Sequence, residues 1–304
     1  MDTTDAPQII EHIHKPINFT PYDTRWVPFS ARFVAMGIHA NAKGALNVYQ
    51  LNNGDLETLV EAKTANGVKC GTFGASSIEE RHIATGDHAG KLVIYDLENT
   101  DKPIFSQQAH VSIINAIDGC GGLDVGYGAP EIVTGGRDGC VRLWDPRVQE
   151  PVLALEPGEG QPARDCWTVA FGNSFSDEDR CIVAGYDNGD VKLFDLRANA
   201  MRYETNVANG VTNIEFDRKD IEMNKMTVSN YIFMSCCCRT HSIKNLYPIV
   251  LHLCPLFFFR SRRWRAGSAC STCARSTPPR ASPAYPRRLT RYRFVLISAT
   301  VSTI

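Results

Sequence analysis

Apolar and polar residues along this chain follow one pattern four times. Three copies align without gaps, IATGDHAGKLVIYDL (83–97), IVTGGRDGCVRLWDP (132–146) and IVAGYDNGDVKLFDL (182–196), and a weaker copy spans residues 33–51. Each copy has an apolar run, then a turn, then alternating apolar and polar residues. Alternation with period two indicates a strand with one buried face, and the glycine-containing turn joins it to the preceding strand. The pattern predicts a β-hairpin that recurs about every 49 residues.

Further strands are predicted on both sides of the hairpins. One strand comes before each hairpin and before a fifth, incomplete unit, and a short strand follows two of the hairpins; these strands begin at Asp23, Cys70, Ile114, Trp167, Val211, Pro103 and Pro151. Four antiparallel strands in about 40–50 residues are typical of one blade of a β-propeller. We therefore expect an all-β protein with four complete blades and part of a fifth.

The tripeptide Leu-Trp-Asp at 143–145 resembles the WD-repeat family. In that family a hydrogen-bonded tetrad joins a loop His, a Ser or Thr, a turn Asp and the Trp. His110, Asp138 and Trp144 fit three of these positions, and the hydroxyl position is assigned to Gly136. The resemblance implies a β-propeller in which these residues hold a blade together and are not catalytic. We expect an incomplete tetrad.

A narrower resemblance rests on segments both inside and outside the hairpins. KCGTFGASS, GAPEIVTGGRDG, RDCWTVAFGN and AGYDNGDVKLFDLR are similar to the Monad family of WD-repeat dynein axonemal assembly factors, and the likeness covers about residues 8–226. This resemblance implies a seven-bladed propeller without a cofactor. It also implies a cytoplasmic adaptor that works with the prefoldin-like and RuvB-like/TPR co-chaperone complex, with dynein subunits as clients.

Charge divides the chain at about residue 226. The whole sequence has 32 Lys and Arg and 33 Asp and Glu, but residues 227–304 contain 12 of the basic residues and none of the acidic ones. Residues 1–226 therefore carry a net charge of −13 and the tail carries +12. The hairpin pattern also stops after Met226. We interpret 1–226 as a partial WD-repeat propeller and 227–304 as a disordered basic tail.

The tail is typical of translated non-coding sequence. The codons of Val228-Ser229 can have the sequence of an intron's splice donor. The codons of residues 246–260 can form a pyrimidine-rich tract that ends in a splice acceptor. When the reading frame is moved one nucleotide upstream, one allowed choice of codons for residues 263–278 encodes SLEGRFRVFDMRTQHP. This sequence matches the missing end of the fifth blade. We interpret the tail as a retained intron followed by a frame-shifted exon.

Two other interpretations of the tail remain open. Cys270 and Cys273 form a CxxC pair, but a zinc site would need two more ligands at suitable spacing. The arginine-rich stretch from 262 to 291 contains aromatic residues, as nucleic-acid-binding arms do.

Catalytic signatures are missing from residues 1–226, which contain no P-loop, GxSxG or HExxH sequence. Their five cysteines lack metal-ligand spacing, and we expect them to be buried, reduced thiols. The start of the sequence does not resemble a signal peptide, and the longest apolar run, 246–259, is too short to span a bilayer. We therefore expect a cytoplasmic, non-enzymatic protein without cofactor or metal and without a membrane or nucleic-acid partner.

Loops and turns on one face of a propeller commonly bind proteins. We expect Arg137, Asp165, Trp167 and Tyr186 to contact a partner there, because Arg and aromatic residues are frequent at protein interfaces. A place in the core is an equal alternative for Trp167.

An alternative function comes from a second motif. Trp144-Asp-Pro-Arg147 and Phe194-Asp-Leu-Arg197 resemble the WDxR pattern of substrate receptors for cullin-type ubiquitin ligases. This resemblance implies that Arg147 and Arg197 contact the ligase adaptor. Local pairing of each arginine with the preceding aspartate would equally explain the motif. A truncated product without function is a further alternative.

Overall fold

The computed structural model describes residues 10–123, 128–158, 160, 162–176, 178–216, 225–230 and 292–298. All the regular elements in these ranges are β-strands, which confirms the all-β prediction.

Four antiparallel sheets each contain four strands in sequence order. Blade 1 has β2 (Thr20–Trp26), β3 (Arg32–Ile38), β4 (Gly44–Asn52) and β5 (Asp55–Thr64). Blade 2 has β6 (Val68–Thr72), β7 (Ile83–Asp87), β8 (Lys91–Tyr95) and β9 (Phe105–Gln108). Blade 3 has β10 (Ile114–Cys120), β11 (Glu131–Gly136), β12 (Val141–Trp144) and β13 (Leu153–Leu155). Blade 4 has β14 (Cys166–Gly172), β15 (Cys181–Tyr186), β16 (Asp190–Asp195) and β17 (Ala200–Asn206).

Two smaller sheets complete the described structure. β18 (Val211–Phe216) pairs with β19 (Met226–Asn230) and forms part of blade 5, as the sequence predicts. β1 (Ile10–Ile17) pairs antiparallel with β20 (Tyr292–Ser298). The described parts of the predicted tail thus contain strand, at 227–230 and at 292–298, where we expected none. The rest of that tail, including Cys270 and Cys273, lies outside the described residues.

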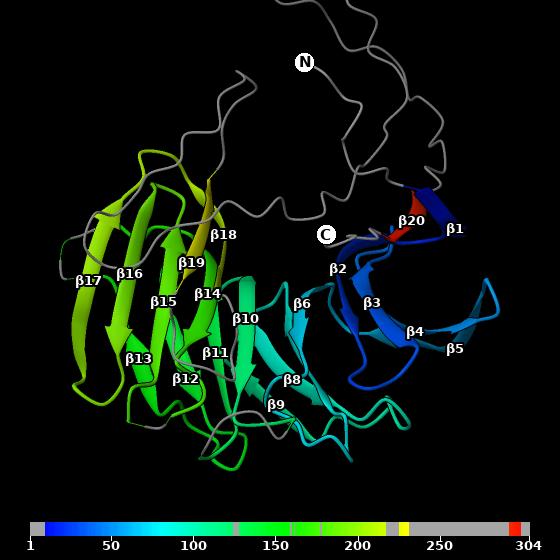
Figure 1. Cartoon of the computed structure of the whole chain (residues 1–304), viewed down its shortest axis with the longest axis horizontal. Coiled ribbons are helices and arrows are strands. Elements are labelled where there is room, and N and C mark those ends of the chain that lie inside the picture. Colours follow the sequence, from blue (N-terminus) through cyan, green and yellow to red (C-terminus); the bar gives the residue numbers. More distant parts are fainter. Residues whose placement is uncertain are drawn as a thin grey trace, which may run out of the picture.

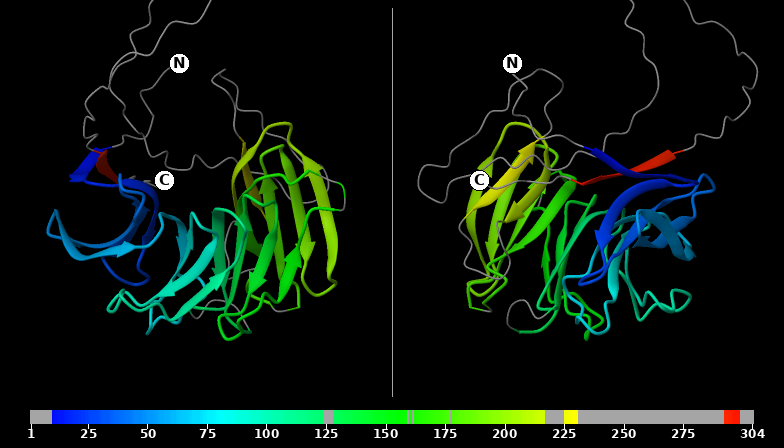
Figure 2. Two further views of the ribbon diagram at one scale, coloured as in Figure 1. Left: turned by 180° about the vertical axis from the view of Figure 1, so that it is seen from behind. Right: turned by 45° about the vertical axis from the view of Figure 1, so that its right-hand side comes forward.

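The blades follow one another along an arc (Figure 1). Their first strands β2, β6, β10, β14 and β18 lie on the inner side and contact one another in that order. The fourth strands β5, β9, β13 and β17 lie on the outer side (Figure 1). Figure 2 shows the same arc from two further directions, with the β1–β20 pair next to blade 1. The loops between strands are therefore gathered on the two faces of the arc.

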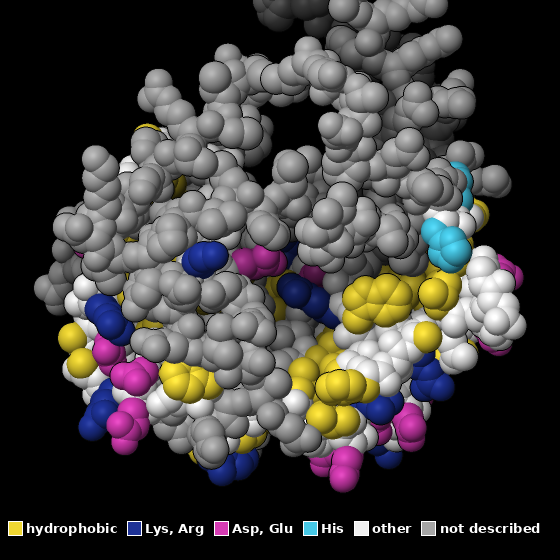
Figure 3. Space-filling model, in the orientation of Figure 1, with side chains coloured by type: hydrophobic (Ala, Val, Ile, Leu, Met, Phe, Trp, Pro, Cys, Tyr) yellow, Lys and Arg dark blue, Asp and Glu magenta, His cyan; other side chains and the backbone are white. Residues whose placement is uncertain are grey.

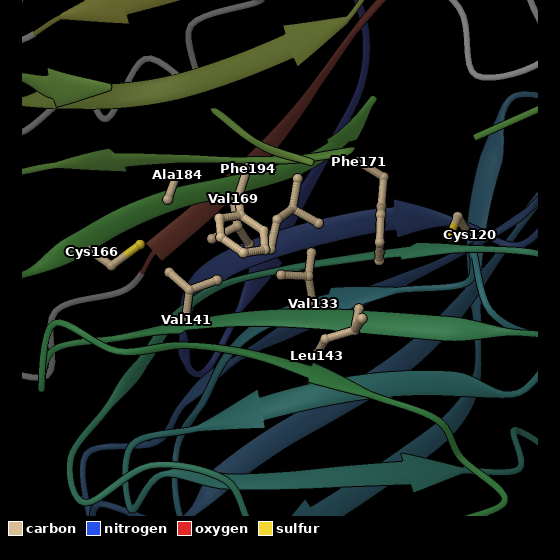
Figure 4. Close-up of a cluster of buried hydrophobic side chains, with 10 residues drawn as sticks. Cys120, Val133, Val141, Leu143, Cys166, Val169, Phe171, Ala184 and Phe194 are labelled. Carbon is tan, nitrogen blue, oxygen red and sulfur yellow. The ribbon is translucent and has the colours of Figure 1, made fainter. Parts of the chain in front are cut away.

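Most of the core lies between successive blades, and a fifth cluster lies on the outward face of blade 1. Four clusters of buried apolar side chains each combine residues from two successive sheets. In the cluster between blades 3 and 4, Val133, Val141 and Leu143 point toward Val169 and Phe171 (Figure 4). Because side chains alternate across a strand, each sheet can supply side chains to a cluster on either side.

Hydrogen bonds also join the inner strands of neighbouring blades. Asp23 Oδ2 accepts from Gly71 N at 3.1 Å, and Asp118 Oδ2 accepts from Phe171 N at 2.9 Å. Thr168 Oγ1 accepts from Ile214 N at 3.2 Å. These side chains satisfy backbone donors that no strand within the same sheet reaches, so they fix each inner strand against the next.

Substitution of Phe171 tests the packing between blades. Phe171→Ala should lower the free energy of unfolding by about 3–5 kcal/mol, because the ring is 1% exposed and its loss leaves a cavity between blades 3 and 4. Phe29→Ala is the matched control, since Phe29 is 77% exposed and should cost less than about 0.5 kcal/mol. Urea unfolding followed by circular dichroism measures both. Similar losses for the two variants would contradict the core described above.

Candidate functional site

A buried hydrogen-bonded network crosses blade 3. His110 Nδ1 lies 2.9 Å from Asp138 Oδ1, and His110 Nε2 lies 2.8 Å from Thr134 Oγ1. Trp144 Nε1 donates to the same hydroxyl at 3.1 Å. Because a carboxylate can only accept, the proton in the first bond belongs to His110 Nδ1. The network thus ties the loop before β10 to β11, to the turn after β11 and to β12.

The expectation of an incomplete tetrad is wrong, because Thr134 supplies the hydroxyl that was assigned to Gly136. Ile132 pairs with Trp144, so Thr134, two residues further along β11, lies on the same face of the sheet as the indole. Gly136 has another role. A Cβ at that position would lie 2.5 Å from Asp138 Oδ1 and closer still to His110 Nδ1. The glycine leaves room for the histidine–aspartate bond.

Asp138 is the charged member of this network. Burial alone would raise the pKa of its carboxyl group, but the hydrogen bond and charge of His110 and the backbone amides of Val111 and Cys140 lower the pKa to about 2. Val111 N donates at 3.1 Å and Cys140 N also at 3.1 Å. The ionised carboxylate therefore organises both the loop before β10 and the turn between β11 and β12.

Two of the predicted partner-binding residues form an ion pair on one face of the arc. We call it the turn face, because it carries the turns between the second and third strands of blades 2 to 4, at residues 88–90, 137–139 and 187–189. Arg137 Nε lies 3.5 Å from Asp165 Oδ2, and 59% of the arginine side chain is exposed. The pair spans from the turn of blade 3 to the loop that enters blade 4.

Trp167 also belongs to the turn face, where it is half-buried. A Cβ at Gly210 would lie 2.5 Å from the indole, so the ring packs directly against the loop that enters blade 5. Tyr186 differs from the expectation of an exposed contact. It packs against the core between blades 3 and 4, and burial raises the pKa of its phenol. Tyr186 is therefore only partly exposed to a partner.

Arg147 and Arg197 lie at the other end of the strands. Each follows the third strand of its blade, whereas the turn face precedes that strand. Arg147 Nη2 lies 2.6 Å from Asp145 Oδ2, and Arg197 Nη1 lies 3.3 Å from Glu178 Oε2. The structure therefore separates these two arginines from the other four predicted contact residues and gives each a local carboxylate.

A feature that the sequence did not reveal repeats along the turn face. The first strand of each of the five blades has a register shift that leaves one residue out of the ladder, always at the corresponding position. These five bulge residues are Tyr22, Lys69, Asn115, Trp167 and Thr212. A bulge redirects a side chain away from the regular pleat. Their side-chain types differ completely, so no sequence pattern marks the position.

The five cysteines of the blades are buried, as expected, and none forms a disulfide. Burial raises the pKa of Cys166 to about 12 and that of Cys181 to about 11, so both are thiols near neutral pH. Within the described ranges, no group of three or more His, Cys, Asp or Glu side chains could hold a metal ion. The same ranges contain no helix long and apolar enough to span a membrane.

Thr134→Val tests the network in blade 3. The substitution keeps the shape of the side chain but leaves two buried ring nitrogens without their hydroxyl, and it should cost about 2–3 kcal/mol of unfolding free energy. Thr85→Val is the control at the equivalent position of blade 2, where the hydroxyl donates only to Val93 O, and should cost about 1 kcal/mol or less. Chemical denaturation measures both values, and equal losses would refute the role of Thr134.

The depressed pKa of Asp138 predicts a specific pH dependence. A carboxyl group with a lower pKa in the folded state contributes stability that is present above its ordinary value of 3.8 and is lost as the pH falls through about 2. The stability difference between the wild type and Asp138→Asn should therefore shrink as the pH is lowered from 6 to 3. Urea midpoints at each pH give this difference. A difference that stays constant would show that the charge of Asp138 is not what stabilises the turn.

Comparison with known proteins agrees with this geometry. A family model described as "WD domain, G-beta repeat" matches residues 101–145, which include all four members of the network in blade 3. Proteins named "Dynein axonemal assembly factor 10" match a longer part of the chain. The relative from Chlamydomonas reinhardtii is 58% identical over 229 residues, which are 75% of this chain and 64% of that protein. The human relative is 54% identical over 231 residues, which are 76% of this chain and 65% of that protein.

A more distant relative of the same name, from Dictyostelium discoideum, is 26% identical over 252 residues, which are 74% of this chain and 66% of that protein. The chain thus spans slightly less than two-thirds of the length of the first two relatives. The repeated hairpins, the four-stranded sheets and the network in blade 3 agree with these matches. Residues 101–145 of this chain match a WD repeat, and three-quarters of the chain is similar in sequence to proteins named as dynein axonemal assembly factors.

Proposed function

We propose that this chain is a non-enzymatic protein-binding platform that takes part in the assembly of axonemal dynein. The observation that carries the proposal is the 54–58% identity, over about 230 residues, to proteins named as dynein axonemal assembly factors. The arc of blades supports it, because a propeller offers a rigid scaffold whose loops can carry different contact residues.

The turn face is the surface that we propose for the partner. Arg137 and the half-buried Trp167 lie there, and Arg and Trp are enriched among residues that dominate binding energy. By the resemblance of the sequence to its family, the partners are the prefoldin-like and RuvB-like/TPR co-chaperone complex, the clients are dynein subunits and the site of action is the cytoplasm. In this proposal the repeat-bearing unit, about residues 1–226, binds the partner, and the basic tail does not.

The ligase-receptor alternative gains no support from the arginines that suggested it. Arg147 is held by Asp145 through several hydrogen bonds, and Arg197 lies against Glu178. Pairing with the preceding aspartate thus explains the motif at Arg147, whereas the Arg197 side chain pairs with a glutamate outside the motif.

Two arginines form a matched pair for testing the proposal. Arg137 and Arg147 are similarly exposed and each faces an aspartate, but they lie on opposite faces of the arc. When the tagged full chain is purified from ciliated cells, mass spectrometry should identify co-chaperone subunits and dynein chains. Arg137→Ala should reduce their recovery several-fold, and Arg147→Ala should leave it unchanged. If a ligase adaptor and a cullin are recovered instead, and Arg147→Ala abolishes their recovery, the ligase-receptor function replaces the one proposed here.

A further inference from the structure

Three side chains from three different elements meet on the turn face where blades 1 and 2 adjoin. Tyr22 and Lys69 are the bulge residues of β2 and β6, and His88 lies in the turn between β7 and β8. The Tyr22 ring lies 5.2 Å from the His88 ring, tilted by 39°. The Lys69 ammonium lies over the Tyr22 ring, 4.6 Å from its centroid. We call these residues the Tyr22–Lys69–His88 cluster.

The positive charge of this cluster is not balanced locally. Within the described part of the chain, no carboxylate lies within ion-pair distance of Lys69. Lys192 provides the contrast, because it also lies over a tyrosine, at 5.7 Å from the Tyr186 centroid, but has Glu204 at 3.1 Å. A lysine that faces an aromatic ring without a carboxylate keeps its charge available for an external anion.

The two aspartates that adjoin the cluster in sequence already accept hydrogen bonds from backbone amides. Asp87 Oδ1 accepts from Ala89 N at 2.9 Å and from Lys91 N at 2.7 Å, and its other oxygen accepts from Asn66. Asp23 accepts from Gly71 N at 3.1 Å and pairs with Arg25. Neither aspartate can turn toward Lys69 without leaving a backbone donor unpaired, so the unbalanced charge is built into the fold.

His88 adds a ring nitrogen that lacks a hydrogen-bond partner among the described residues. This atom, Nε2, is buried. Burial, and then the charge of Lys69, lower the pKa of His88. An unpaired buried polar atom is costly, and a negative charge bound at Lys69 would offset the repulsion between the ammonium and a protonated His88. Tyr22, which is 42% exposed, forms the accessible side of the cluster.

We propose that the Tyr22–Lys69–His88 cluster binds a carboxylate from an acidic segment of a protein partner. The proposal rests on the function proposed above, in which the turn face binds proteins, and it adds a second contact on that face where blades 1 and 2 adjoin. The ammonium of Lys69 pairs with the carboxylate, and the exposed Tyr22 ring packs against the rest of the acidic side chain. A nucleic-acid backbone is bound by a row of basic side chains, whereas this cluster offers the single ammonium of Lys69, so one carboxylate is the favoured anion. The binding energy of a single carboxylate depends mainly on charges within about 8 Å of it at physiological salt.

Fluorescence anisotropy of the purified full chain with a labelled hexaglutamate peptide tests this site. We expect saturable binding of hexaglutamate and no binding of hexaglutamine. Lys69→Gln should weaken the binding about tenfold, as expected for the loss of one charge-assisted contact. Lys192→Gln, the matched lysine over a tyrosine, should change the Kd less than about twofold because Glu204 already occupies that ammonium. Circular dichroism verifies that both variants unfold at the wild-type midpoint.

Three results would overturn the inference. They are the absence of saturable hexaglutamate binding, equal effects of Lys69→Gln and Lys192→Gln, and tighter Lys69-dependent binding of a dT12 oligonucleotide than of hexaglutamate. The experiment is independent of the purification from cells. If co-chaperone subunits are recovered but hexaglutamate binding does not depend on Lys69, this site fails and the proposed function stands. If Lys69-dependent binding holds but no assembly machinery is recovered, the proposed function fails and the site stands.

Discussion

The constraint that governs this protein is that a blade has no core of its own. Each four-stranded sheet places apolar side chains on both faces, and these are buried only because another sheet lies against them. Met36 and Leu46 of blade 1, for example, are covered by Val68 and Ile83 of blade 2. Burial of this kind contributes roughly 25 cal/mol per Å² of apolar surface, so the stability of each blade depends mainly on its neighbours.

This dependence makes the outward face of blade 1 a special position. No further blade precedes it among the described residues, and Phe33 and Tyr49 on that face are covered by Ile13, Ile17 and Phe19, from β1 and the residues that follow it. Trp26 packs edge-on against Phe33 but is still 52% exposed. Hydrophobic side chains are visible over the region of β2 and β3, whereas charges of both signs alternate along the lower edge (Figure 3). The chain therefore compensates for a missing neighbour with an N-terminal strand.

Much of this architecture could be predicted from the sequence, because period-two alternation and glycine turns leave few alternatives. The hairpin at 132–146 and the strand that begins at Ile114 were both predicted and both form. The role of Thr134 does not follow from the spacing to Gly136, but Thr85 occupies the same position in the preceding repeat. The β1–β20 pairing and the environment of Tyr186 depend on contacts between distant segments, which local patterns do not encode.

The repeats themselves separate what the fold requires from what it leaves free. Glycine recurs at 86, 135 and 185, because a Cβ there would lie 2.5–2.7 Å from side chains on the inner strand of the next blade. The bulge position nearby follows no such rule, since it holds Tyr22, Lys69, Asn115, Trp167 and Thr212 in turn. All five side chains are at least partly exposed and point away from the ladder. Packing between blades therefore fixes where these side chains lie more strictly than which they are, so the turn face can present a different chemical group from each blade.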